Sequence, residues 1–144
     1  MKWSGLLVVL GLAACAGVRT YPNDGAKNIV VRSALDSKVR AALHLHQVDA
    51  KCHTEYQGSV AIDAPAVVVG VPAERLSYVV VTFDSSSFGW GSRTTSVVTL
   101  IEPRKGYSYD LLLTYRDSIY NVALGEIDAK GTRREIPRRG LRCS

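Results

Sequence analysis

The fold class of this chain is decided by residues 38–49, KVRAALHLHQVD. Apolar residues at positions 39, 41, 43 and 45 alternate with residues that are mostly polar or titratable, and this period of two is typical of a strand with one buried face. His44 and His46 then fall on the face opposite Leu43 and Leu45, which the alternation assigns to the core.

Similar strand-like segments follow one another along the rest of the chain, and no window after the first residues shows a sustained period of 3.6. Short strands separated by turn residues and rich in Val, Thr, Ile and Tyr indicate an antiparallel sandwich or barrel. Parallel strands would need crossover helices, for which the pattern leaves no room. We therefore predict an all-β chain with a single antiparallel β-sandwich of about 8–9 strands, immunoglobulin- or transthyretin-like in outline. The other expected strands are 27–33, 58–62, 67–71, 75–83, 94–102, 107–115, 119–127 and 132–136.

The first residues have a different character from the strands. One lysine, Lys2, precedes an apolar run over 6–14 that ends in small residues, which is the pattern of a secretory signal peptide. The apolar run is too short to span a bilayer as a helix, which needs about 20 residues.

The end of this leader, Leu12-Ala13-Ala14-Cys15, resembles the lipobox of bacterial lipoproteins. That resemblance implies lipid on the Cys15 thiol, cleavage before Cys15 and acylation of the new amino terminus. Together with the strand pattern, it predicts a cleaved signal peptide over 1–14, a lipidated tether over 15–26 and a β-sandwich domain over 27–144. By analogy with lipoprotein sorting, Ala16 favours the outer membrane, with the domain facing the periplasm. The alternative is an ordinary cleaved signal with a chance cysteine.

Lipidation would leave two cysteines, Cys52 and Cys143. An even pair in an oxidising compartment predicts a disulfide, which would close a loop of about 90 residues and stabilise the fold by roughly 4–5 kcal/mol in the chain-entropy model. The alternative is a metal-binding or catalytic thiol.

The histidines are weak candidates for a metal site. His44 and His46 share one strand face, and His53 follows Cys52. A zinc site needs three or four convergent ligands. We therefore expect no metal and no other cofactor, with His44 and His46 on the solvent face.

The longest expected loop, residues 84–92, places Phe88 and Trp90 among serines and glycines. Aromatic residues on a loop can anchor a partner, or they can fold back and cap an open end of the sandwich. Both readings remain open.

Apart from the charge of Lys2 in the leader, the net charge of +5 comes from the C-terminal segment, which includes Arg133, Arg134, Arg138 and Arg139. These arginines could bind anionic headgroups or an acidic protein patch, or they could protect an edge strand from pairing. Nucleic acid is not an expected partner, because the envelope holds little of it.

No nucleophile elbow, paired carboxylates or phosphate-binding glycine loop is found, so we expect no enzyme activity. The sequence predicts a membrane-anchored binding or scaffold module with an envelope protein as partner, as an accessory of an envelope or secretion assembly. The alternative is a periplasmic ligand or metal carrier that uses His44 and His46 or the Phe88–Trp90 loop.

Overall fold

The computed structural model describes residues 18–87, 89 and 91–143. This part of the chain contains nine strands and no helix, so no helix able to cross a membrane is found in it. The predicted leader and Cys15 lie outside the described residues. The strands are β1 (Ile29–Ala34), β2 (Val39–Val48), β3 (Thr54–Ile62), β4 (Ala66–Val69), β5 (Ser77–Ser87), β6 (Gly91–Ile101), β7 (Ser108–Arg116), β8 (Ile119–Ile127) and β9 (Arg133–Ile136).

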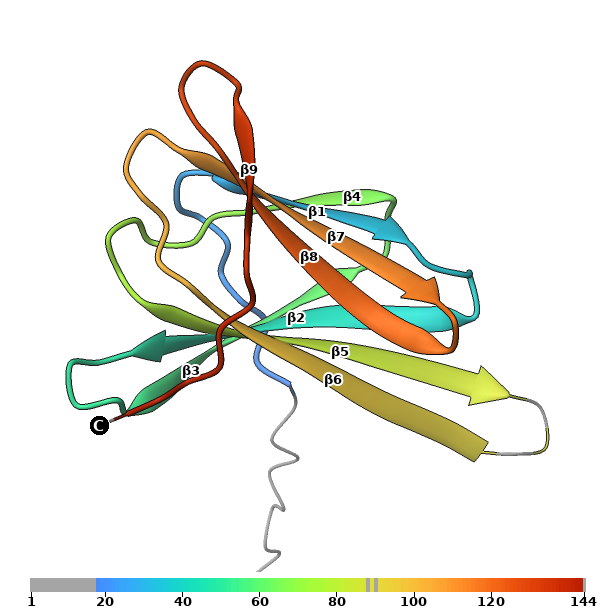
Figure 1. The fold of residues 1–144 in the computed structure, drawn as a ribbon. Coiled ribbons are helices and arrows are strands. Elements are labelled where there is room, and N and C mark those ends of the chain that lie inside the picture. The colour runs from blue at the N-terminus through green and yellow to red at the C-terminus, as the bar shows by residue number, and fades with distance from the viewer. Residues whose placement is uncertain (1–17, 88, 90, 144) are drawn as a thin grey trace, which may run out of the picture.

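Two sheets pack against each other, which confirms the predicted β-sandwich (Figure 1). One sheet has five strands in the order β4-β1-β7-β8-β9, and the other has four in the order β3-β2-β5-β6. The core between them is formed by alternate residues of each central strand, such as Leu43 and Leu45 of β2, Val81 of β5, and Leu111 and Leu113 of β7. The period of two therefore identified the buried faces correctly.

One strand pair departs from the antiparallel arrangement expected throughout. β1 and β7 are parallel, with Ile29 opposite Tyr109 and Ala34 opposite Thr114. Parallel neighbours need a long connection, and here five other strands provide it, four of them in the opposite sheet, without any helix in the described residues.

Both ends of the described chain lie against the sandwich. Near the N-terminus, the Ser59 amide donates to Arg19 O at 2.8 Å, the Tyr21 amide donates to Ser59 O at 2.9 Å, and the Tyr21 hydroxyl donates to Gly70 O at 2.7 Å. A Cβ on Gly58 would come within 2.6 Å of the Tyr21 nitrogen, so glycine permits this close approach. The predicted tether over 15–26 is therefore attached to the domain from Arg19 onward, because its backbone bonds to β3 and its Tyr21 side chain bonds to the β4–β5 connection.

The C-terminal tail crosses from one sheet to the other. After β9, the Leu100 amide of β6 donates to Arg139 O at 2.9 Å. The tail then reaches the β2–β3 turn, where Cys143 forms the predicted disulfide with Cys52 across a Cα–Cα distance of 6.0 Å. The tail and the disulfide together join the two sheets.

Candidate functional site

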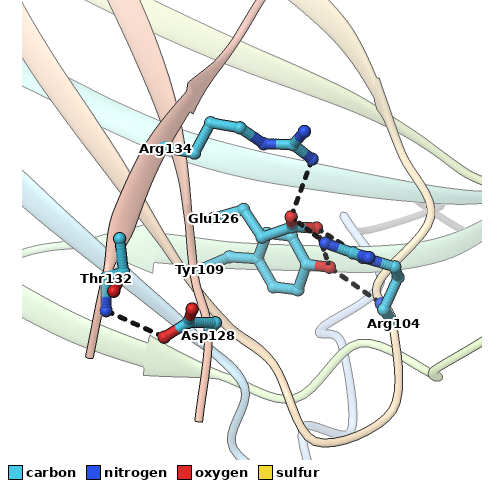
Figure 2. Close-up of polar contacts among 6 residues, drawn as sticks. All are labelled: Arg104, Tyr109, Glu126, Asp128, Thr132 and Arg134. Atoms are coloured by element: carbon cyan, nitrogen blue, oxygen red, sulfur yellow. Dashed lines mark hydrogen bonds and ion pairs between the residues drawn. The ribbon is translucent and has the colours of Figure 1, made fainter. Parts of the chain in front are cut away.

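A polar cluster lies among the core-facing positions at one end of the sandwich. It consists of Arg104, Tyr109, Glu126 and Arg134, and we call it the arginine–glutamate cluster (Figure 2). Tyr109, Glu126 and Arg134 are direct neighbours across β7, β8 and β9, so strand register alone places them in one row. Arg104 joins them from the β6–β7 loop, where its amide donates to the Tyr109 hydroxyl oxygen at 2.8 Å.

Glu126 is the centre of this cluster and is 6% exposed. Its carboxylate accepts hydrogen bonds from Arg104 Nε at 3.0 Å, from the Tyr109 hydroxyl at 2.9 Å and from Arg134 Nη2 at 2.9 Å, and it also pairs with Arg104 Nη2. The Arg104 guanidinium, helped by Tyr109 and Arg134, lowers the pKa of Glu126 to about 2 against the opposing effect of burial.

These values define what the carboxylate can do chemically. A group with a pKa of about 2 is a poor proton acceptor near neutral pH, so Glu126 is badly matched to general acid–base work. Its oxygens already have partners, which favours a role in holding the loop and β9 in place. Arg104 and Arg134 keep exposed side chains, and the Arg104 guanidinium lies 3.9 Å from the centre of the Tyr107 ring.

The cluster forms one wall of a cleft of about 600 Å³. Ile101, Pro103, Tyr107 and Ile136 contribute apolar surface to it. This volume is within the range of about 300–1,000 Å³ typical of small-molecule sites.

The predicted arginine segment is divided by the structure. Arg133 forms an ion pair with Asp110 at 3.0 Å, lying over Gly125, where a Cβ would come within 2.1 Å of Asp110 Oδ1. Arg134, its neighbour on β9, pairs with Glu126 instead. Arg138 and Arg139 follow in the tail and are exposed. Because side chains alternate along a strand, Arg133 and Arg134 pair with different acidic residues. β9 is an edge strand of its sheet, which is the position at which arginines could protect against pairing with another chain.

The aromatic segment differs from its prediction. Residues 84–92 are not a long loop, because the β5–β6 ladder continues to the pair Ser87 and Gly91. Gly89 and Gly91 have φ values of +88° and +80°, which glycine adopts at little steric cost at the end of this hairpin. Phe88 and Trp90 lie outside the described residues, so their partner-binding and capping readings both stay predictions.

The histidines occupy two places. His44 and His46 lie half-buried on the outer face of the four-stranded sheet, where His44 Nε2 is 3.1 Å from the Thr82 hydroxyl and the His46 ring is 5.0 Å from the Tyr56 ring. His53 is in the β2–β3 turn, 3.0 Å from Asp49. Within the described ranges no three His, Cys, Asp or Glu side chains are grouped as a metal site would need.

The sequence interpretation did not identify Arg104, Tyr109 and Glu126 as a site. A signal was present, because Val122, Leu124 and Glu126 are successive inward positions of β8 and a carboxylate at such a position needs a partner. The identity of that partner depends on the β6–β7 loop, which has no periodicity to read. Comparisons of the chain with protein-family models, with curated proteins and with solved structures found no match.

Proposed function

We propose that this chain is a lipid-anchored lipoprotein of the bacterial envelope that acts as a non-enzymatic binding or scaffold module. Cys15 is the lipidated residue, and the domain faces the periplasm, with the outer membrane as its location. The leader supports this proposal, and so does the Cys52–Cys143 disulfide, which is typical of an oxidising compartment. The module would serve as an accessory of a larger envelope or secretion assembly.

The observation that carries the binding role is the distal half of the β5–β6 hairpin. All six residues over 91–96 are exposed, although they remain in register with β5. In Figure 1 this hairpin extends beyond the end of the other sheet. Over 91–96 the β6 strand of this ribbon is exposed, whereas Phe83 of β5, opposite Thr95, is buried in the core. The ribbon beyond this pair contributes little to the core, and it can present its end, past the Ser87–Gly91 pair, to a partner.

The hairpin is a better candidate for the partner site than β9. Arg133 and Arg134 already form ion pairs within the domain, so breaking these pairs would oppose binding elsewhere. The serines and threonines of the hairpin form few side-chain contacts within the domain, and the hydrogen bond from Thr94 to Asp84 is one of these few.

A shortened hairpin tests this assignment. Ser85 and Arg93 are directly paired, so residues 86–92 can be replaced by Asn-Gly, which closes a two-residue turn between them. The matched control is Asn-Gly in place of Asp117 and Ser118, whose φ values of +52° and +64° already suit such a turn. Affinity purification from solubilised envelope should lose a specific protein partner only with the shortened hairpin. Equal partner recovery from both variants would contradict the assignment.

The anchor is tested separately by mass spectrometry of the purified native chain. We expect a chain that begins at Cys15 and carries fatty acids, and a Cys15→Ser variant that moves to the soluble fraction. An unmodified start with material free in the soluble fraction would refute the lipoprotein proposal.

A second candidate function, a ligand carrier, is favoured by the cleft beside the arginine–glutamate cluster. Of the residues expected to serve a carrier, His44 and His46 do not line this cleft, and Phe88 and Trp90 lie outside the described residues. Native mass spectrometry of the undenatured chain should then show a stoichiometric small-molecule adduct that is lost in Arg134→Ala. A bare polypeptide mass would count against the carrier.

A further inference from the structure

Three of the four edge strands in this sandwich are protected against pairing with another chain. The N-terminal segment covers β3 through the Thr20–Ser59 bridge. β4 has four residues, and the Asn23 side chain bonds both Val68 O and the Gly70 amide beside it. β9 also has four residues, begins with two arginines and is followed by Pro137. Short strands, covering segments, charges and proline are the usual means of blocking an edge.

The fourth edge strand, β6, lacks such protection over most of its length. It has 11 residues and contains neither proline nor lysine. In the described part of the chain its only strand partner is β5, and its outer edge is bonded only at Leu100, whose amide donates to Arg139 O. Because that N–H points away from β5, strand alternation directs the backbone groups of Ser92, Thr94, Ser96 and Val98 outward as well.

We propose that a second copy of this chain adds its β6 strand to this open edge. The two β6 strands run antiparallel about a two-fold axis at Thr95, with Thr94 opposite Ser96 of the second copy and Ser92 opposite Val98. Each of these pairs consists of residues with outward backbone groups, so each exchanges both backbone hydrogen bonds. The ladder ends where the tail occupies Leu100.

The side chains of β6 fit this register. Thr95 meets its own copy, and Thr–Thr pairs across a sheet are favourable. The one charged residue of the strand, Arg93, lies opposite Val97 of the second copy, so no like charges face each other. The open segment is therefore complementary to itself, as a two-fold interface must be.

The choice of a second copy as occupant also rests on the proposed lipid anchor. A two-fold axis that relates antiparallel edge strands stands perpendicular to the sheet, so both four-stranded sheets present the same outer face to the same side. Because β3 and β6 are opposite edges of this sheet, the two N-terminal segments, each bridged to β3 at Ser59, lie at opposite ends of the joined sheet but at the same level along the axis. Two copies anchored in one membrane can adopt this arrangement without inverting either of them.

Charge pairs on the full-length chain test the register. Thr94→Lys with Ser96→Lys would place lysines directly opposite each other at two positions and should abolish the dimer in sedimentation velocity. The matched control, Thr94→Lys with Ser96→Glu, places Lys opposite Glu at the same two positions and should restore it. Circular dichroism and retention of the Cys52–Cys143 disulfide show that both variants fold.

Cysteine crosslinking locates the axis. In an antiparallel pair without hydrogen bonds between the opposed residues, the Cα atoms are about 4.5 Å apart, which suits a disulfide. Thr95→Cys should therefore crosslink to its own copy on mild oxidation, as identified by peptide mass spectrometry. Arg93→Cys should not, because its own copy is about 13 Å away along the strand.

The outcomes separate this inference from the proposed function. A wild-type chain that is monomeric in sedimentation overturns the inference, even if it captures a different protein through the hairpin. Equal crosslinking at positions 93 and 95 also overturns it. A dimer that carries no lipid and captures no envelope partner leaves the β6 pairing standing and refutes the proposed function.

Discussion

Replacing Glu126 by Gln removes the charge at the centre of the arginine–glutamate cluster and keeps the shape of the side chain. The variant leaves the hydroxyl of Tyr109 and the guanidinium groups of Arg104 and Arg134 facing a neutral amide. Charge-assisted hydrogen bonds are roughly twice as strong as neutral ones, so folding stability should fall.

The size of the loss follows from the pKa shift. The pKa of Glu126 falls from 4.5 to about 2 on folding, and at 1.36 kcal/mol per unit this corresponds to about 3 kcal/mol. The side chains of Arg104 and Arg134 are 51% and 71% exposed. Water therefore screens their ion pairs with Glu126, and in the variant it can serve as a hydrogen-bond partner for both guanidinium groups. We therefore expect Glu126→Gln to lower the free energy of unfolding by about 2 kcal/mol near neutral pH.

The pH dependence identifies charge as the cause. Because the folded pKa lies below the unfolded one, the stabilisation is complete above the unfolded pKa of 4.5 and disappears as the pH falls towards 2. The wild type and the variant should differ by about 2 kcal/mol near pH 7 and by less than half of that near pH 3.

Urea unfolding of both proteins at the two pH values measures this difference. Glu135→Gln is the matched control, since Glu135 is exposed on β9 and forms no ion pair with the described residues. Its stability should differ from the wild type by less than about 0.5 kcal/mol. A Glu126→Gln protein as stable as the wild type near pH 7, or equally weakened at both pH values, would refute the reasoning.

Three further predictions concern stability and titration. Replacing Cys52 and Cys143 by Ser opens a loop with a sequence separation of 91 and should cost about 4–5 kcal/mol in urea unfolding; a loss below about 1 kcal/mol would contradict the entropic argument. Gly58→Ala should lower the free energy of unfolding by about 1–3 kcal/mol and speed hydrogen exchange of the Tyr21 amide, because Gly58 has φ of +138° and the added Cβ meets the Tyr21 backbone. The control is Gly25→Ala, whose added Cβ meets no atom within 4 Å, and unchanged exchange at Tyr21 in Gly58→Ala would argue against the contact. The pKa of His46 is lowered by burial and by the neighbouring His44, so its NMR titration midpoint should lie below 6.5. Because the unfolded chain then binds a proton more readily than the folded one, folding stability should fall as the pH drops below 6.5. A midpoint at or above 6.5 would show that the environment of His46 is not as described.

Much of the fold follows from local patterns. In the middle of β2, at positions 41, 43 and 45, and of β7, at positions 109, 111 and 113, every second residue is apolar and buried, so these strands and their inward faces could be read directly. The β8–β9 turn was also predictable, because Asp128 accepts hydrogen bonds from the Lys130 and Thr132 amides and Gly131 has φ of +83°. The Cys52–Cys143 disulfide followed from there being two cysteines besides Cys15.

The missed features depend on partners far away in the sequence. The pairing of Ile29 with Tyr109 joins segments separated by most of the domain, and neither strand alone indicates a parallel neighbour. Ser85 and Ser86 have weak strand propensity, and only their cross-strand partners Arg93 and Ser92 keep them extended. The arginine–glutamate cluster likewise needed the position of the β6–β7 loop, which no local pattern sets.

The hydrogen bond between Arg19 O and the Ser59 amide limits how far the body can stand from its anchor. If lipid is attached at Cys15, four residue steps link it to Arg19, and an extended chain covers at most about 14 Å over that distance. Such a short linker would keep the domain in the part of the periplasm next to the bilayer. A binding partner would then have to be located at that same membrane surface or extend to it, because the anchored domain could not cross the periplasm to reach the partner.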